Sequence, residues 1–152
     1  MAGSRQSMFA RLFGDPEHDP LVLDLKAKLE DLQRRFELAE DSRCQVEALN
    51  RSSAIIEFKP DGTILGANGN FLEVVGYSLE EVRGQHHRMF VEPAERETQA
   101  YRDLWARLGR GEYAAGQFFR IGQGGTEVWL DASYHPVFDA TGKLYKVVKY
   151  AR

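Results

Sequence analysis

The sequence predicts an α+β fold in which a long N-terminal helix precedes one five-stranded antiparallel sheet with helices on one face. Two observations predict this fold class. From Asp19 to about Arg51 the chain has no glycine and repeats apolar residues at helical spacing. From Ser53 onward, short β-prone runs alternate with turn residues in the order two strands, three helices, three strands. The most economical arrangement of that order is a single sheet with its helices packed on one face, which leaves a pocket between them.

Composition divides the chain into a flexible N-terminal segment (residues 1–18), an amphipathic, coiled-coil helix (19–51) and a globular domain (52–152). Residues 1–18 carry basic residues but only scattered apolar ones, which is not the pattern of a secretory signal. No apolar run reaches the roughly 18 residues of a membrane span. The single cysteine, Cys44, excludes an internal disulfide and suits a reducing compartment. We therefore expect a cytoplasmic protein without a transmembrane segment.

The helix over 19–51 begins with Asp19, which can cap free N–H groups, and Pro20, which suits the first helical position. Its apolar residues follow alternating steps of three and four, interrupted at Arg43. This heptad seam cannot bury itself, so it needs either its own globular domain or the same helix of a second chain. We expect a homodimer through this helix, with docking onto the domain as the alternative. The seam residues are Val22, Leu25, Leu29, Leu32, Phe36, Ala39 and Val46.

Turn and capping signals delimit the first elements of the globular domain. The turn 60–62 stands between the β-prone runs AIIEF and ILGAN, which predicts a hairpin with Gly62 at positive φ. A short helix is predicted over GNFLEVVGY. A second helix begins at Ser78, where Glu81 completes a capping box, and ends at Gly84.

The longest helix of the domain is predicted to begin at Pro93 and to end near Gly109. Three strands follow it, YAAGQFFRI, EVWLDASYHPVF and KLYKVVKYA, and the loops GQGG and DATG join them as hairpins. One face of the predicted helix carries the apolar residues Tyr101, Leu104, Trp105 and Leu108.

This order of elements, with these residues, resembles a PAS domain. The stretch DGTILGANGNFLEVVGYSLEEVRGQ is similar to the strand-to-helix signature of that family. The segments HHRMFVEP, LWARLGRGE and VWLDASYHPVFD are most similar to the PAS modules of bacterial methyl-accepting chemotaxis proteins, including aerotaxis transducers. The resemblance covers residues 52–152. The signature residues are Asp61, Gly62, Asn68, Phe71, Gly76, Tyr77, Ser78, Glu81 and Gly84.

The resemblance implies a sensory input module that detects redox state, oxygen or a small ligand and signals by rearrangement of a dimer. In such receptors a downstream signalling domain contacts a histidine kinase and its adaptor, so the resemblance implies these partners. The alternative is a ligand-free PAS module that only dimerises or binds other proteins. A net charge of −3 with mixed signs argues against nucleic acid as a partner. Neither a G-x-S-x-G motif nor a phosphate loop is present, so we expect no enzyme and no catalytic residue.

Two adjacent histidines, His86 and His87, raise the question of a metal or haem site. Adjacent side chains point in different directions, so the pair is not expected to chelate one metal ion. Haem b would need a histidine that faces the pocket. The predicted long helix has no histidine, so His87 or His86 would have to bind haem from the preceding turn. Family position favours His87 as the inward residue, a hydrogen-bond donor at the pocket edge, with His86 in solvent.

The resemblance also allows FAD as the cofactor. Flavin-binding aerotaxis transducers have tryptophans at positions that match Trp105 and Trp129, and such an aromatic wall suits an isoalloxazine ring. Two departures count against flavin: the family's Pro-Trp is here 113–114, and its Asn-Arg-Arg is here 120–122. The tryptophans could instead be core aromatics of a domain without cofactor, and Asn68 could simply cap a helix. The candidate pocket residues are Phe58, Asn68, His87, Tyr101, Trp105, Phe119 and Trp129, and we expect Phe58, Phe119 and Trp129 on the inner sheet face.

Overall fold

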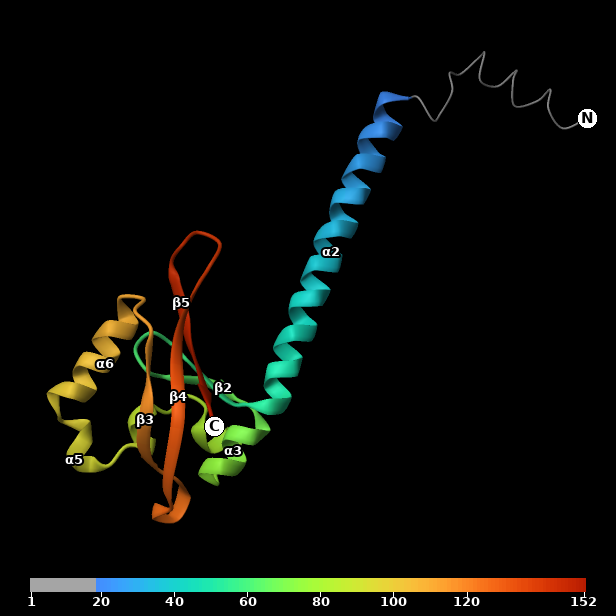
Figure 1. The fold of residues 1–152 in the computed structure, drawn as a ribbon. Helices are drawn as coiled ribbons and strands as arrows, with labels where there is room; N and C mark the ends of the chain where they lie inside the picture. Colours follow the sequence, from blue (N-terminus) through green and yellow to red (C-terminus); the bar gives the residue numbers. More distant parts are fainter. Residues whose placement is uncertain (1–18) are drawn as a thin grey trace, which may run out of the picture. The chain divides into compact units, whose positions relative to one another are not determined.

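A computed structural model of the protein describes residues 19–152 (Figure 1). The predicted flexible segment 1–18 lies outside the described residues. The chain divides into two compact units, with the boundary between Glu47 and Ala48, slightly before the predicted one. Over residues 19–152, none of the helices combines the length and the apolar surface that a membrane crossing needs.

The long N-terminal helix is confirmed as α2 (Pro20–Ser52). At its start the Asp19 carboxylate accepts a hydrogen bond from the Leu21 N–H at 2.8 Å, which is the predicted cap. The helix buries none of its residues. At the interruption of the seam, Arg43 pairs with Glu40 at 2.9 Å on the helix's own surface. Large apolar side chains are exposed at Leu25, Leu29, Leu32, Phe36 and Val46.

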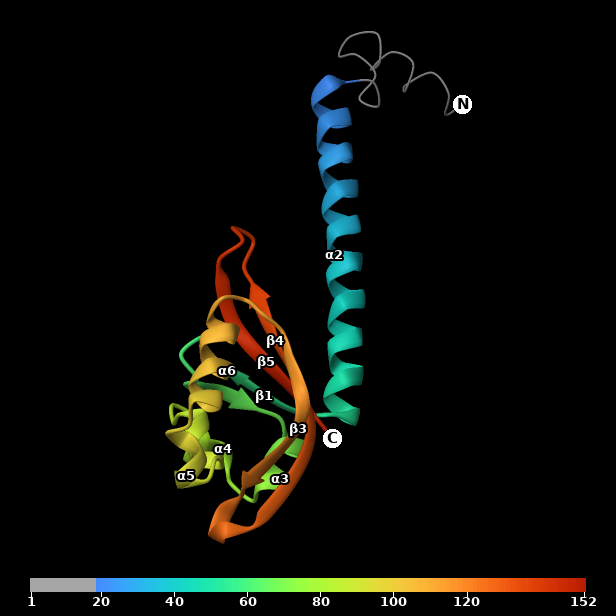
Figure 2. The same cartoon turned by 60° about the vertical axis from the view of Figure 1, so that its left-hand side comes forward.

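The five predicted strands form one antiparallel sheet in the order β2-β1-β5-β4-β3. The fold class is therefore confirmed. Figure 2 shows α4, α5 and α6 on the same side of this sheet. The strands are β1 (Ala54–Phe58), β2 (Ile64–Ala67), β3 (Ala114–Ile121), β4 (Glu127–Phe138) and β5 (Leu144–Ala151).

Short helices occupy the middle of the chain: α3 (Gly69–Val75), α4 (Leu79–Val82), η1 (His87–Phe90), α5 (Pro93–Arg96) and α6 (Gln99–Gly109), while η2 (Gln123–Gly125) lies in the β3–β4 loop.

The prediction of one continuous helix from Pro93 is wrong, because Thr98 divides it. Thr98 has an extended backbone (φ −72, ψ 152), and its hydroxyl accepts a hydrogen bond from the Tyr101 N–H. This cap starts α6 as a new helix.

The predicted turns and caps are present. Gly62 has a φ of 91°, and a Cβ there would lie 2.6 Å from the His86 Nε2, so only glycine fits this turn. At the start of α4 the Ser78 N–H donates to the Glu81 carboxylate at 2.7 Å, and the Glu81 N–H donates to the Ser78 hydroxyl at 3.3 Å. These two bonds form the predicted capping box.

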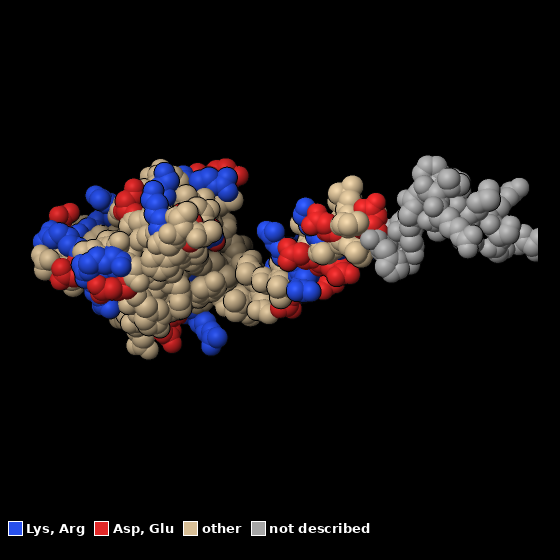
Figure 3. Space-filling model, turned by 90° about the horizontal axis from the view of Figure 1, so that it is seen from above, with Lys and Arg blue, Asp and Glu red and all other residues tan. Residues whose placement is uncertain are grey.

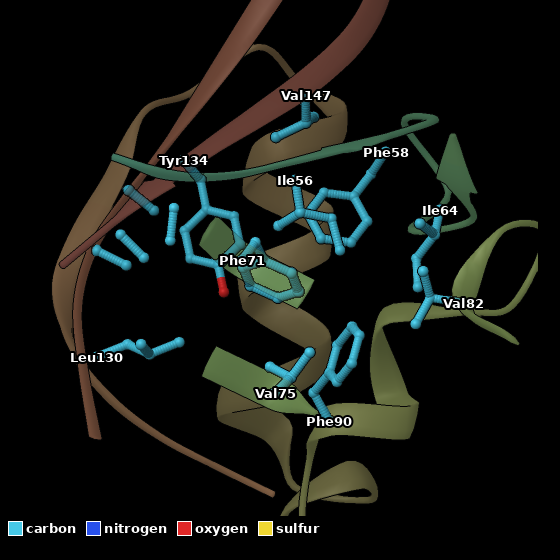
Figure 4. Close-up of a cluster of buried hydrophobic side chains, with 14 of the residues drawn as sticks. Ile56, Phe58, Ile64, Phe71, Val75, Val82, Phe90, Leu130, Tyr134 and Val147 are labelled. Atoms are coloured by element: carbon cyan, nitrogen blue, oxygen red, sulfur yellow. The ribbon is translucent and has the colours of Figure 1, made fainter. Parts of the chain in front are cut away.

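The core lies between the sheet and the helices, and strand periodicity decides which side chains enter it. Along β4, Leu130 and Tyr134 are buried while Trp129, directly before Leu130, is exposed. Figure 4 shows the packed cluster, with residues such as Ile56, Phe71 and Phe90 converging from strands and helices. On the described surface visible in Figure 3, acidic and basic side chains are intermixed.

Candidate ligand-binding site

His87 lies at the centre of a buried polar cluster between the sheet and the helices. Its side chain is 1% exposed. Its Nδ1 lies 3.0 Å from the Tyr101 hydroxyl on α6, and its Nε2 lies 3.1 Å from the Tyr134 hydroxyl on β4. A neutral imidazole donates from one nitrogen and accepts at the other. One tyrosine hydroxyl therefore accepts from His87 while the other donates to it. Reversing the donor and acceptor in one of these hydrogen bonds requires the same reversal in the other.

Burial keeps His87 neutral. Desolvation lowers the pKa of His87 well below its usual value, and the nearby charges of Lys149 and Arg120 lower the pKa further. Burial also raises the pKa of Tyr101, which keeps its hydroxyl protonated. His87 and Tyr101 are therefore uncharged at neutral pH, and the chain Tyr101–His87–Tyr134 connects α6 to β4 through hydrogen bonds alone.

Aromatic rings surround this chain of hydrogen bonds. Phe58 meets the His87 ring edge-on at 5.3 Å, and Trp105 does so at the same centroid distance. The Tyr101 ring stacks on His87 at 5.8 Å. The structure thus brings together four of the seven predicted pocket residues: Phe58, His87, Tyr101 and Trp105.

The His86 side chain has a structural role in the turn. Its Nε2 lies 2.8 Å from the Asp61 carbonyl oxygen, and its Nδ1 accepts from the Arg88 N–H at 3.1 Å. His86 is half-buried rather than fully solvated, because its ring caps η1 and contacts the Asp61 turn. The cap fixes the start of η1, so the next side chain, His87, points into the core.

Asn68 serves the backbone rather than the pocket. Its Oδ1 accepts from the Ile55 and Phe71 N–H groups at 2.9 and 3.0 Å. Its Nδ2 donates to the carbonyls of Asn50 and Ser53 at 3.0 and 2.8 Å. The helix-capping interpretation is confirmed, and the side chain's hydrogen-bonding groups are already engaged with backbone atoms.

Trp129 and Phe119 lie on the other face of the sheet. Their rings pair at 5.2 Å, and Trp129 is 70% exposed. Phe119 and Trp129 are opposite one another in register, and the neighbouring pair Phe118 and Leu130 faces inward. The prediction that these two residues face the inner pocket is wrong, because side chains alternate between the faces of a strand.

These positions test whether the suggested cofactors fit. A flavin stacked between Trp105 and Trp129 does not fit, because the two rings lie on opposite faces of the sheet. A haem iron would have to displace a tyrosine, because both ring nitrogens of His87 are within hydrogen-bond distance of tyrosine hydroxyls. Within residues 19–152, no group of three His, Cys, Asp or Glu side chains is placed to hold a metal ion.

Two buried cations on the inner face were missed by sequence reasoning. Arg120 on β3 and Lys149 on β5 are each 1% exposed. The Arg120 guanidinium lies 5.0 Å and the Lys149 ammonium 5.7 Å from the centre of the Phe118 ring. Strand periodicity could have located both, because they share the inner positions of their strands with Phe118 and Val147.

A cavity of about 390 Å³ lies beside Arg120. It lies between β3 and the α5–α6 segment. Its inner lining includes Tyr101, Leu104, Ala114, Phe118 and Arg120, and Glu95 and Arg107 also line it. Tyr101 therefore borders both the cavity and His87, so a molecule in the cavity can reach the buried hydrogen-bond chain.

Comparison with known proteins supports the same fold. A family model described as PAS fold matches residues 64–151. Biofilm dispersion protein BdlA of Pseudomonas aeruginosa is 53% identical over 111 residues, which are 73% of this chain and 27% of that protein. The aerotaxis receptor of Escherichia coli is 34% identical over 74 residues, which are 49% of this chain and 14% of that protein. The chain thus spans less than a third of either relative.

A solved light-oxygen-voltage domain, studied with a flavin analogue, has a TM-score of 0.62 and 24% identity to this chain. The similarity covers 72% of this chain and 83% of that one, and it concerns the fold alone.

Proposed function

The chain belongs to the PAS fold family, and we propose that it is the cytoplasmic sensory input module of a chemoreceptor. In this proposal a small molecule occupies the cavity beside Tyr101, and the module signals by rearranging a dimer held by α2. The downstream signalling domain and the histidine kinase–adaptor complex implied by the resemblance are part of the proposal. The two curated relatives, a biofilm dispersion protein and an aerotaxis receptor, support a sensory role.

The observation that carries the proposal is the buried chain Tyr101–His87–Tyr134. It joins the wall of the cavity to the central part of the sheet, across hydrogen bonds of 3.0 and 3.1 Å. A ligand that reorients the Tyr101 hydroxyl changes which nitrogen of His87 carries the proton, and hence the bond to Tyr134. Such a ligand shifts a conformational equilibrium only if it binds the two arrangements with different affinity.

The dimer part of the proposal rests on α2. Its seam exposes Leu25, Leu29, Leu32 and Phe36, and a helix of this kind gains stability chiefly by packing its apolar side. We expect Leu29→Glu with Leu32→Glu to convert a dimer to a monomer in sedimentation equilibrium. Gln33→Glu, next to the seam, is the matched control and should leave the mass unchanged. A double variant that sediments like the wild type would contradict a dimer through α2.

A ligand-free dimerisation module is the second candidate, and the closely packed aromatic core favours it. Cys44 separates the two candidates, because it is the only cysteine of the chain and is exposed on α2. Spin labels at Cys44 report the distance between the two helices of a dimer. For a sensor, Tyr134→Phe should change this distance distribution, whereas Tyr150→Phe on the outer face of β5 should not. Identical distributions for the wild type and both variants would favour the ligand-free module.

The visible absorption spectrum of the purified chain tests the cofactor. We expect neither flavin bands nor a Soret band, because the two tryptophans do not form one wall and both nitrogens of His87 are engaged. A yellow protein would contradict this expectation and indicate FAD, and a Soret band would contradict it and indicate haem b.

A further inference from the structure

We propose that the cavity between β3 and the α5–α6 segment binds a small organic anion with one carboxylate, which Arg120 holds. This inference rests on the proposed sensory function and names the chemical class of its ligand. The observation behind it is a buried guanidinium whose hydrogen-bonding capacity is only partly used.

Three nitrogens of Arg120 are unequally engaged. Its Nη1 donates to the Phe119 carbonyl at 2.6 Å and lies 3.4 Å from the Glu95 carboxylate. Its Nε and Nη2 are buried and have no hydrogen-bond partner among the described residues. Nε and Nη2 form one edge of the guanidinium, and this edge matches the two oxygens of a carboxylate. The free edge is therefore suited to a bidentate carboxylate.

The charge balance points the same way. Lys149 is buried as well, and no carboxylate of residues 19–152 lies within 4.0 Å of its ammonium group. Burial lowers the pKa of Lys149, as expected for a cation without a close anionic partner. Of these two buried cations only Arg120 has a carboxylate within 4.0 Å, and that carboxylate, Glu95, is partly exposed. A buried charge without compensation is unfavourable, so a bound anion would stabilise this site.

The cavity limits the size of the ligand. Its volume of about 390 Å³ is at the lower end of the range for small-molecule pockets. Ala100, Leu104, Ala114 and Phe118 give it an apolar lining, so the body of the ligand is apolar.

An acidic side chain at the mouth of the cavity limits the charge of the ligand. The exposed Asp103 accepts a hydrogen bond from Gln99 there and would repel a second carboxylate. At the rim, Arg107 lies 3.3 Å from Glu112 and is already paired. These features together favour a monocarboxylate with a short apolar body, whose carboxylate lies at the Arg120 end.

The test follows the Arg120 Nε–H resonance by NMR in the full chain, with Arg120→Lys used to assign it. Sodium acetate is the probe, and sodium chloride at the same ionic strength is the control. We expect acetate to move this resonance with a saturable dependence, and chloride to leave it in place. Acetate should also raise the thermal midpoint of the wild type by several degrees. Arg102→Gln, an exposed position of α6 outside the cavity lining, should retain this rise, whereas Arg120→Gln should lose it.

Three results would overturn the inference: a resonance that moves equally with acetate and chloride, an acetate effect that persists in Arg120→Gln, or saturation by phosphate but not by acetate. A folding defect of Arg120→Gln cannot obscure the outcome, because the resonance is measured in the wild type. If acetate binds but the distances between Cys44 labels change neither with acetate nor in Tyr134→Phe, the proposed sensory function is wrong while the anion site is supported. If the distances respond to Tyr134→Phe and acetate does not bind, only the anion site fails.

Discussion

The two faces of the sheet contain similar kinds of residue but use them in opposite ways. The inner face buries Tyr134, Arg120 and Lys149 within an apolar core, while the outer face exposes the aromatic ring of Trp129. Aromatic character therefore does not identify the interior of this domain. Buried polar groups are unfavourable unless they are paired, so polar groups retained on the inner face are stronger indicators of a binding site than apolar ones.

The largest difference between the faces should appear when a core ring is removed. Phe58 is fully buried and packs edge-on against His87 and Trp105. We expect Phe58→Ala to lower the free energy of unfolding by about 3–5 kcal/mol, from lost burial and an unfilled cavity. Urea unfolding followed by circular dichroism measures this change. A loss below about 1 kcal/mol would mean that the inner face is not packed as described.

The next effect concerns the polar chain. Tyr134→Phe keeps the ring but leaves His87 Nε2 buried without its partner, which should cost about 1–3 kcal/mol. The matched control is Tyr150→Phe on the outer face of β5, where the ring is half-buried. We expect the control to remain within about 0.5 kcal/mol of the wild type in the same unfolding experiment. Equal losses in the two variants would remove the distinction between the faces.

Acid should lower the stability of the folded domain through His87 on the inner side of the sheet. Its pKa in the folded protein lies well below the usual value of 6.5, because the ring is buried beside Lys149 and Arg120. The unfolded chain therefore binds a proton that the folded chain does not, so stability falls as the pH drops below about 6.5 toward the folded pKa. Thermal midpoints between about pH 7 and about pH 5 should show this slope in the wild type. His86→Gln should retain the slope, and His87→Phe should reduce it; a persistent slope in His87→Phe would assign it to other groups.

The helices and strands can be predicted well from the sequence because their signals are local. The hairpin at Gly62, the capping box of Ser78 and the helix cap of Asn68 each depend on residues within a few positions. The break at Thr98 was missed, although its hydroxyl caps α6 in the same way. There the apolar residues of α6 and the proline at 93 predict one continuous helix, but the local cap at Thr98 starts a new one.

The site was predicted less completely, because it depends on which strand positions face inward. His87, Tyr101, Trp105 and Phe58 do converge, but Tyr134, which completes the hydrogen-bond chain, was missed. In β4 the even-numbered positions, Val128 to Tyr134, are more uniformly apolar than the odd-numbered ones, so the sequence did contain the correct periodicity. Why an arginine lies inward at position 120 cannot be inferred locally, because its carboxylate partner, Glu95, comes from α5.

The smallest effect is expected on the outer face, at the residue that was assigned to the pocket. Trp129 is 70% exposed and packs mainly against Phe119, its partner across the strands. Trp129→Ser removes this cross-strand pair, so we expect a loss of no more than about 0.5–1 kcal/mol. Trp105→Ser is the matched variant, and because its ring packs on Phe58 and His87 it should cost several times more. Urea unfolding compares the two, and equal losses would place Trp129 in the core after all.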